Sequence, residues 1–476
     1  MKRAWVLLLV TVAIAGTAMG QTSRPDSETA KAMANLAAQT RNTLCIVELT
    51  IKDEMINSPT GTAPVFGMGI CVKVEGDKAT LITTALDPRI SPKSVKKDGV
   101  QVTVPGGEKK LTGAYLSTDP QTGITFVTVT DATYKWQAVR FAEKPELGVG
   151  KQVFSVGLLE PWLGYEPYVG TAFVSAKVRV PGPMIYCTGG ALTNVGSPVL
   201  TADGTAVGII LQQLPNTVTL SGVQQPINLS AQRESSCFVP SDEFGAIINN
   251  PPATPKPLPW IGVLGWEPVP AELNLTYTAV RVVRVAPNST TLSSPAARAG
   301  LKDKEIIKGI DGLAIEKFPT PEMTLNNFLR VINRMPAGSK LKLNVMDREK
   351  PVELDVEAFP PAPRDAAKYK HMALGMIVRD KVALDEALDT TATAKEKGVY
   401  VVSVFGPDSP AALAGLKGEP DFHLITKVML QPVTSVAEFQ AIVEKELSGG
   451  LKPINMVVSK GASTENIVVK PVTKAP

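Results

Sequence analysis

The second half of this 476-residue chain contains one sequence motif twice. The motif SPAARAGLK begins at position 294, and SPAALAGLK begins at position 409, 115 residues later, with eight of nine residues identical. A repeat with this spacing predicts two domain-sized units and excludes a short-period solenoid. In each copy the motif lies between two β-branched segments, which are followed by a segment with apolar residues at helical spacing.

These segments predict the same order of elements in both copies. Strands are expected at 280–285 and 399–404, then at 305–310 and 424–428. Each helix is expected to bury one apolar face, made of Leu325, Phe328, Leu329 and Ile332 in the first copy and of Val436, Phe439 and Val443 in the second. The first copy has Asp311-Gly312 as a turn, whereas the second has Met429-Leu430 there. We therefore expect an altered hairpin in the second copy.

The first half of the chain has a different pattern. Ser27 can cap a helix over 28–41. Short β-branched segments follow, separated by Gly, Pro and polar turns, at 45–51, 69–74, 79–84, 100–104, 124–129, 152–157, 171–180 and 206–211. Such strands with few helices predict a β-barrel or sandwich. A short helix at 242–248 and a proline-rich linker at 249–259 are expected to end this region.

The N-terminus has the features of an export signal. Lys2-Arg3 precede an apolar run at 4–16 and the small residues around Met19, which predicts cleavage before Gln21. An uncleaved anchor is the alternative, although the run is shorter than the ~18 residues of a membrane span. The formal charge of +4, from 49 Lys plus Arg against 45 Asp plus Glu, excludes an electrostatic nucleic-acid binder. We expect a periplasmic or extracellular protein without a membrane span after cleavage.

Residues 193–200 (TNVGSPVL), followed by Asp203-Gly204 and Val207-Gly208-Ile209, resemble the nucleophile loop of HtrA/Deg-type serine proteases. In that family the loop reads G-N-S-G-G-P-L. The duplicated S-P-A-A-x-A-G-L motif resembles PDZ domains of the circularly permuted bacterial type. The resemblance implies a mainly β fold, in which a trypsin-like double β-barrel precedes two α+β PDZ domains. The implied boundaries are signal peptide 1–20, helical segment 21–43, barrels 44–248, linker 249–259, first PDZ 260–358, linker 359–368 and second PDZ 369–472.

The same resemblance implies that the catalytic triad is missing. Leu86, Gly123 and Val195 occupy the places of the histidine, aspartate and serine, and the segment 21–258 contains no histidine. A triad needs a nucleophile, an imidazole and an orienting carboxylate. We therefore expect no catalytic residue. The alternative is an active serine-type endopeptidase with an unorthodox site, in which Ser197 is the nucleophile and a lysine is the base.

The PDZ resemblance also implies peptide-binding residues. In the first copy they are Trp260, Ile261, Gly262, Val263, Leu325 and Phe328; in the second they are Leu374, Gly375, Met376 and Phe439. A Φ-G-Φ loop can present backbone N–H groups to a peptide carboxylate, and the ligand then adds as a strand. We expect the first copy to hold the working groove.

Four cysteines, Cys45, Cys71, Cys187 and Cys237, allow three pairings. Alignment with the family favours a disulfide between Cys187 and Cys237, with Cys45–Cys71 as a second bridge; buried thiols are the alternative. No ligand spacing for zinc and no phosphate or dinucleotide motif occurs, so no metal or cofactor is expected.

Together these features predict an exported HtrA-like pseudoprotease that binds peptide C-termini or unfolded protein segments through PDZ domains. It would be a scaffold, a chaperone-like binder or a regulator of active HtrA-type relatives in extracytoplasmic protein quality control. The resemblance implies a homo-oligomer, a trimer in many family members. A further reading makes the barrels a spacer and leaves binding to the PDZ copies.

Overall fold

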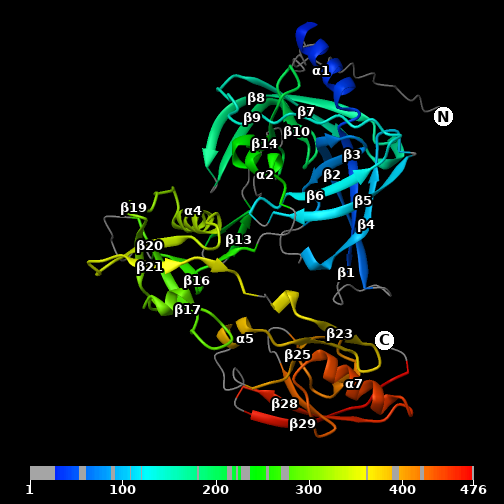
Figure 1. The fold of residues 1–476 in the computed structure, drawn as a ribbon, viewed down its shortest axis with the longest axis vertical. Coiled ribbons are helices and arrows are strands. Elements are labelled where there is room, and N and C mark those ends of the chain that lie inside the picture. Colours follow the sequence, from blue (N-terminus) through cyan, green and yellow to red (C-terminus); the bar gives the residue numbers. More distant parts are fainter. Residues whose placement is uncertain are drawn as a thin grey trace, which may run out of the picture.

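The computed structural model describes residues 27–52, 61–86, 92–107, 109–119, 121–179, 182–211, 217–220, 223–226, 236–252, 257–269, 278–360, 363–388, 396–418, 423–461 and 463–473 (Figure 1). The predicted signal peptide at 1–20 lies outside these residues. The described chain forms two β-barrels followed by two smaller units built from a sheet and helices. We call these the first and second repeat units.

The first barrel closes in the strand order β1-β2-β3-β6-β5-β4. Alternate residues point inward, as in β5, where Leu111 and Tyr115 are buried between exposed neighbours. Its core is mainly aliphatic and contains Tyr115, Trp136 and both Cys45 and Cys71. The strands are β1 (Leu44–Lys52), β2 (Thr62–Glu75), β3 (Lys78–Thr83), β4 (Val95–Thr103), β5 (Lys110–Thr118) and β6 (Thr125–Thr130), with a short 3₁₀ helix η1 (Pro92–Ser94) before β4.

The second barrel closes in the order β10-β11-β14-β9-β8-β7. Helix α1 (Ser27–Thr40) packs against β7 and β8, and Leu36 is fully buried in the core that the two barrels share. The strands are β7 (Gln152–Leu158), β8 (Pro167–Arg179), β9 (Pro183–Ala191), β10 (Pro198–Leu200), β11 (Ala206–Ile209) and β14 (Ser236–Pro240). The hairpin β12 (Thr217–Leu220) and β13 (Val223–Pro226), η2 (Pro161–Leu163), η4 (Ser241–Glu243) and α2 (Gly245–Asn249) complete this part. Of the two predicted alternatives, barrel and sandwich, the structure has the barrel, and it contains two of them.

The two repeat units share one fold, and the duplicated motif explains how its short helix begins. Ser294 and Ser409 each cap a helix by accepting the N–H of Ala297 and Ala412 at 3.3 Å. A proline follows each cap at the first helical position, where its missing N–H costs nothing. Leu301 and Leu416 then enter the two cores, so the serine, proline and leucine of the motif have the same structural roles in both copies.

The first repeat unit consists of β15 (Pro259–Trp260), β16 (Val263–Pro268), β17 (Val280–Val285), α3 (Pro295–Arg298), β18 (Ile306–Ile310), β19 (Leu313–Ala314), α4 (Pro321–Asn333), β20 (Lys340–Val345), β21 (Val352–Asp355) and β22 (Glu357–Ala358). The second consists of η6 (Pro363–Asp365), β23 (Lys368–His371), β24 (Met376–Asp380), α5 (Ala383–Leu388), β25 (Val399–Val404), α6 (Pro410–Leu413), β26 (Leu424–Val428), β27 (Gln431–Pro432), α7 (Val436–Leu447), β28 (Ile454–Lys460) and β29 (Ser463–Val469). The predicted strands and long helices are confirmed in both copies.

The turn in which the copies differ keeps its geometry. Asp311 and Gly312 have φ angles of 49° and 81°, and Met429 and Leu430 have 49° and 65°. Both turns join equivalent strand pairs, β18–β19 and β26–β27. The expected alteration of the second hairpin is therefore wrong: Met429 and Leu430 adopt the left-handed backbone that the fold requires, at a cost in strain.

Polar contacts connect both barrels to the first repeat unit. Glu243, which is 16% exposed, accepts hydrogen bonds from the guanidinium groups of Arg330 and Arg334 on α4. Gln121, in the turn that contains Gly123, donates to the carbonyl of Asn333 at the end of the same helix. Between the two repeat units lies an apolar cluster that includes Trp260, Ala286, Leu292, Leu384 and Ala387. Beside it, the hydroxyl of Thr291 donates to Glu386 at 2.9 Å.

Candidate functional site

The three predicted triad positions converge between the barrels. Thr84, Ile124 and Gly196, each within two residues of one such position, line a crevice that is too narrow for water. The rest of its lining is isoleucine and Thr83. The structure therefore brings together the surroundings of a triad, but the crevice is apolar.

The residues at the three positions have no proton-transfer chemistry. Leu86 is 2% exposed and belongs to the core of the first barrel. Gly123 has a φ of 72° and donates its N–H to the carbonyl of Asp119 at 2.9 Å, which closes a tight turn. Val195 is 48% exposed. Asp119 is buried and accepts from the N–H and hydroxyl of Thr122, so its carboxylate holds the turn together.

Ser197, the alternative nucleophile, lies inside the protein. Its relative exposure is 0%, and its Oγ has no hydrogen-bond partner among the described residues. A serine nucleophile needs a base within hydrogen-bond reach and access to substrate. Ser197 meets neither condition in this conformation.

Three N–H groups of the loop at 193–200 donate hydrogen bonds within the protein. Thr193 donates to Ser155 Oγ at 2.8 Å, Gly196 to the carbonyl of Ile210 at 2.6 Å, and Ser197 to the carbonyl of Asn194 at 3.1 Å. Tyr168 donates its hydroxyl to Asn194 Oδ1 at 2.8 Å. Acyl transfer by this fold stabilises an oxyanion with N–H groups of this loop. Of these donors, the N–H of Thr193, two residues before the nucleophile position, is already bonded to Ser155.

Both histidines of the chain lie in the second repeat unit. His371 ends β23, and His423 is buried immediately before β26. Burial lowers the pKa of His371 below its ordinary value, although Glu444 acts in the opposite direction. Neither imidazole belongs to a barrel strand.

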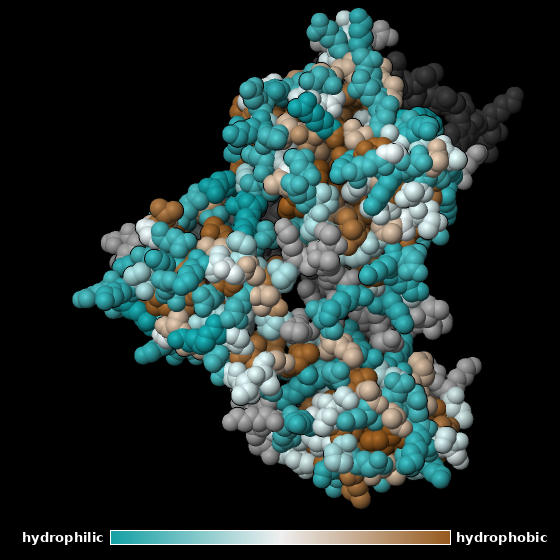
Figure 2. Space-filling model, viewed as in Figure 1, coloured by the Kyte–Doolittle hydropathy of each residue, from teal (hydrophilic) through white to brown (hydrophobic). Residues whose placement is uncertain are grey.

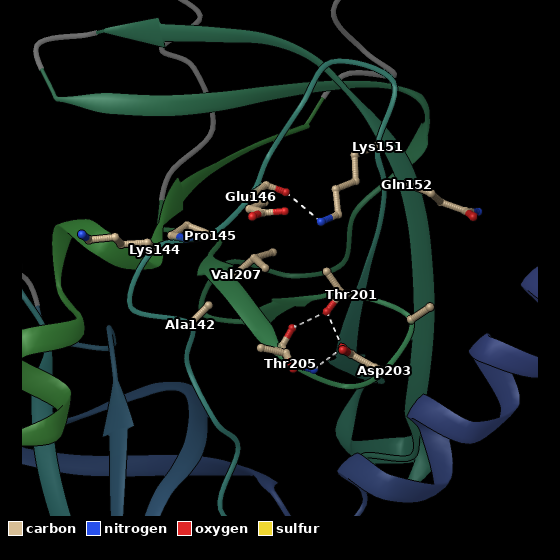
Figure 3. Close-up of a pocket in the computed structure, with 11 residues that line it drawn as sticks. Ala142, Lys144, Pro145, Glu146, Lys151, Gln152, Thr201, Asp203, Thr205 and Val207 are labelled. Atoms are coloured by element: carbon tan, nitrogen blue, oxygen red, sulfur yellow. Dashed lines mark hydrogen bonds between the residues drawn. The ribbon is translucent and has the colours of Figure 1, made fainter.

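A surface pocket of about 450 Å³ lies beside the second barrel (Figure 3). Its polar groups bond to one another: Lys151 donates to the carbonyl of Glu146 at 2.7 Å, and Asp203 accepts from the hydroxyl of Thr201 and the N–H of Thr205. These bonds lower the pKa of Asp203, with the Thr201 hydroxyl as the largest cause. Asp203 is thus a turn acid. Among the described residues no group of three or more His, Cys, Asp or Glu could hold a metal ion.

The structure corrects the disulfide prediction. Strands β9 and β14 are neighbours, but Cys187 pairs with Ser236 and Cys237 pairs with Tyr186. Because successive strand residues point to opposite faces, the two sulfurs lie on opposite sides of the sheet, and no disulfide joins them. Cys45 and Cys71 also remain thiols, in the first core. Burial raises the pKa of both Cys71 and Cys187 to about 12, which makes these thiols unreactive.

In the first repeat unit the Φ-G-Φ loop is held by the duplicated motif. The carbonyls of Ile261 and Gly262 accept the N–H groups of Ala296 and Ala286, at 2.9 and 2.8 Å. Gly262 has a φ of 85°, and a Cβ there would lie 2.5 Å from Ser294 Oγ. Only glycine therefore fits. The next strand, β16, is at one end of the strand order of its sheet.

The other predicted groove residues of this unit differ in exposure. Leu325 on α4 is half-buried, whereas Phe328 is 1% exposed and lies under Trp266, with ring centroids 4.8 Å apart. Trp260 packs on Phe359 at the contact with the second unit. Trp266 was not predicted as a groove residue, because nothing in the local sequence pattern indicates that it packs over α4.

In the second repeat unit Leu374, Met376 and Phe439 are fully buried. Gly375 has a φ of 69°, and a Cβ there would lie 2.7 Å from the Cβ of Ser409, so the requirement for glycine recurs. Here, however, β23 pairs with β24.

The two closed six-stranded barrels define a trypsin-like double β-barrel, followed by further sheets. In agreement, the family model of the trypsin-like peptidase domain matches residues 67–209.

Proteins similar to this chain include two chlamydial proteins described as probable periplasmic serine endoprotease DegP-like. The one from Chlamydia pneumoniae is 23% identical over 379 residues, which cover 78% of this chain and 71% of the relative. The one from Chlamydia muridarum is 25% identical over 380 residues, covering 78% and 69%. Periplasmic serine endoprotease DegP of Salmonella typhimurium is 23% identical over 367 residues, covering 71% and 65%. The family model and these relatives support kinship with HtrA/DegP-type trypsin-like serine proteases.

Among solved structures, the HtrA-type protease AlgW with decapeptide superposes with a TM-score of 0.47 at 15% identity, covering 69% of this chain and 99% of that chain. In the part of the chain that the structure describes, no helix is both long and apolar enough to cross a membrane.

Proposed function

We propose that this protein is an exported HtrA-type pseudoprotease that binds extended peptides through two PDZ domains, the first and second repeat units. The observation that carries the proposal is the apolar crevice between the barrels, lined by near neighbours of the three triad positions, which are occupied by Leu86, Gly123 and Val195. Periplasmic relatives and the N-terminal sequence support export. An extracytoplasmic scaffold, a chaperone-like binder or a regulator of active relatives fits this description, as does assembly into trimers.

An active endopeptidase remains the second candidate, and the geometry speaks against it. Cleavage through Ser197 would require a fully buried hydroxyl to reach solvent and find a base, and no lysine lines the crevice. Loss of one triad member already costs about 10⁴-fold or more in rate.

The first unit supports peptide binding through its edge strand and α4. A ligand can add as a strand to β16, with its carboxylate at the loop around Gly262, and place an apolar side chain against Leu325. Trp266 then forms the adjacent wall and shields Phe328 from the ligand. This arrangement makes Leu325 the residue of α4 that a ligand would contact.

The test combines activity and binding in the full chain. We expect no cleavage of unfolded casein and no fluorophosphonate labelling; labelling that disappears in Ser197→Ala would establish the endopeptidase instead. Peptides with apolar C-terminal residues should bind, and their amidated twins should not.

A matched pair of substitutions on α4 then locates the groove. Leu325→Ser should weaken peptide binding about tenfold, because part of a buried leucine contact is lost. Val331→Ser, at a 38% exposed position of the same helix, should have little effect. Equal affinity for the amidated peptides, or equal effects of the two substitutions, would disprove this assignment.

A further inference from the structure

The space where a peptide would add to the second repeat unit already contains a strand of the protein. β23 pairs antiparallel with β24, and Lys368 is opposite Arg379 and His371 opposite Met376. On its other side β23 contacts α7: the hydroxyl of Tyr369 donates to Glu444 Oε1 at 3.1 Å. β23 therefore lies between the edge of the sheet and the helix, on the side of the unit that carries α7 (Figure 1).

The chain direction matches that of a ligand. β23 runs toward the Φ-G-Φ loop, so its last residue, His371, arrives where a peptide would place its terminal carboxylate. There the carbonyl of His371 accepts the N–H of Gly375 at 3.0 Å, and its Nδ1 accepts the N–H of Leu374 at 3.1 Å. Two acceptors of one residue thus satisfy two consecutive loop N–H groups, as the two oxygens of a carboxylate would.

Tyr369 anchors the strand. Its ring lies 6.4 Å from that of Phe439 and 5.7 Å from that of His371, and it packs against the core of the unit. The alternate residue Lys370 lies over the ring of Phe405 instead. On β23, the side chains on the face toward α7 are therefore those of His371, the final residue, and of Tyr369, two positions before it.

In the first repeat unit, the segment before the Φ-G-Φ loop does not pair with the strand after the loop. Pro255, Pro257 and Pro259 precede its loop, and proline cannot donate to a sheet ladder. The short strand β15 pairs with β22 there, not with β16. Residues 368–371 contain no proline and are able to pair along β24.

We propose that β23 is a built-in ligand of the second repeat unit, which closes its groove to other peptides, with His371 in the place of a terminal carboxylate. The inference rests on the proposed peptide-binding function of the repeat units. The peptide that enters once β23 has left is extended, ends in a free carboxylate and has an aromatic residue two positions earlier. β23 is joined directly to the loop, so its effective concentration is about 1 mM or more. If the β23 segment has an intrinsic Kd of about 10 µM for the open groove, the ratio of the two values lowers the affinity of any competing peptide roughly 100-fold.

The probe is a synthetic fluorescent peptide with the sequence of residues 362–371 and a free C-terminus, added to the full chain. In the double variant Tyr369→Ala/His371→Ala the anchors are removed, and the probe should bind on the order of 100-fold more tightly than to wild type. Lys368→Ala, on the same strand, is the control and should resemble wild type. Fluorescence anisotropy measures affinity, and hydrogen exchange of the Leu374 and Gly375 amides locates the probe.

Removing the anchors should accelerate exchange of these two amides, and the probe should restore their protection. Equal affinity of the probe for wild type and the double variant, or unchanged exchange in the variant, would overturn the proposal. If the double variant does not fold, His371→Ala alone still tests the assignment through the Leu374 amide, which loses its Nδ1 acceptor and should exchange faster. Binding of apolar-ended peptides at Leu325 is measured separately, so failure of the proposed function is distinguishable.

Discussion

Replacing Leu430 with glycine should stabilise the second repeat unit. Leu430 has a φ of 65° in the β26–β27 turn, where the first unit has Gly312 at 81°. A left-handed backbone costs a residue with a side chain about 1–2 kcal/mol. Leu430 is 83% exposed, so little apolar contact is lost. Glycine also makes the unfolded chain more flexible, which reduces the gain in the free energy of unfolding by about 0.4–1 kcal/mol. The net gain should be about 1 kcal/mol.

For a unit of this size, 1 kcal/mol corresponds to a rise of roughly 4–8 °C in Tm. Differential scanning calorimetry of the full chain should show this shift in the transition of the second unit only. The reverse change, Gly312→Leu, is the matched control and should lower the transition of the first unit by a similar amount. If Leu430→Gly lowers the Tm, or if Gly312→Leu has no effect, backbone strain does not explain this turn.

Two further predictions follow from pKa shifts. Burial lowers the pKa of His371, despite the opposing charge of Glu444. The native state therefore binds fewer protons than the unfolded chain. Docking of β23 should be complete above about pH 6.5 and weaken as the pH falls through the lower native pKa. Exchange of the Leu374 amide should report this loss, and His371→Gln should remove its pH dependence; the same pH profile in that variant would contradict the assignment. Burial raises the pKa of Cys187 to about 12, so iodoacetamide should label the native protein slowly at pH 8 and should label all four cysteines after denaturation. Non-reducing peptide mapping should find no linked pair of cysteines. Rapid labelling of the native protein would contradict the burial.

Much of the fold is predictable because it depends on local signals. The β-branched segments predict most barrel strands and the strands on either side of the duplicated motif. The missing histidine of the barrels is likewise visible in the sequence alone.

The remaining features depend on contacts between distant segments. A one-residue difference in strand register separates Cys187 from Cys237, and no local pattern encodes it. β23 is short and alternates lysine with aromatic rings, so it gives a weak strand signal and no sign of its partner. The place of Trp266 over Phe328 depends on how α4 packs.

The attachment of α4 to both barrels gives the barrels a mechanical role. Arg330 and Arg334 are four residues apart on one face of the helix, and both bond to Glu243, while Gln121 binds the end of the helix. A peptide that widens the space between β16 and α4 must strain these bonds. The barrels therefore set the stiffness of the proposed groove, and they can do so without any catalytic residue.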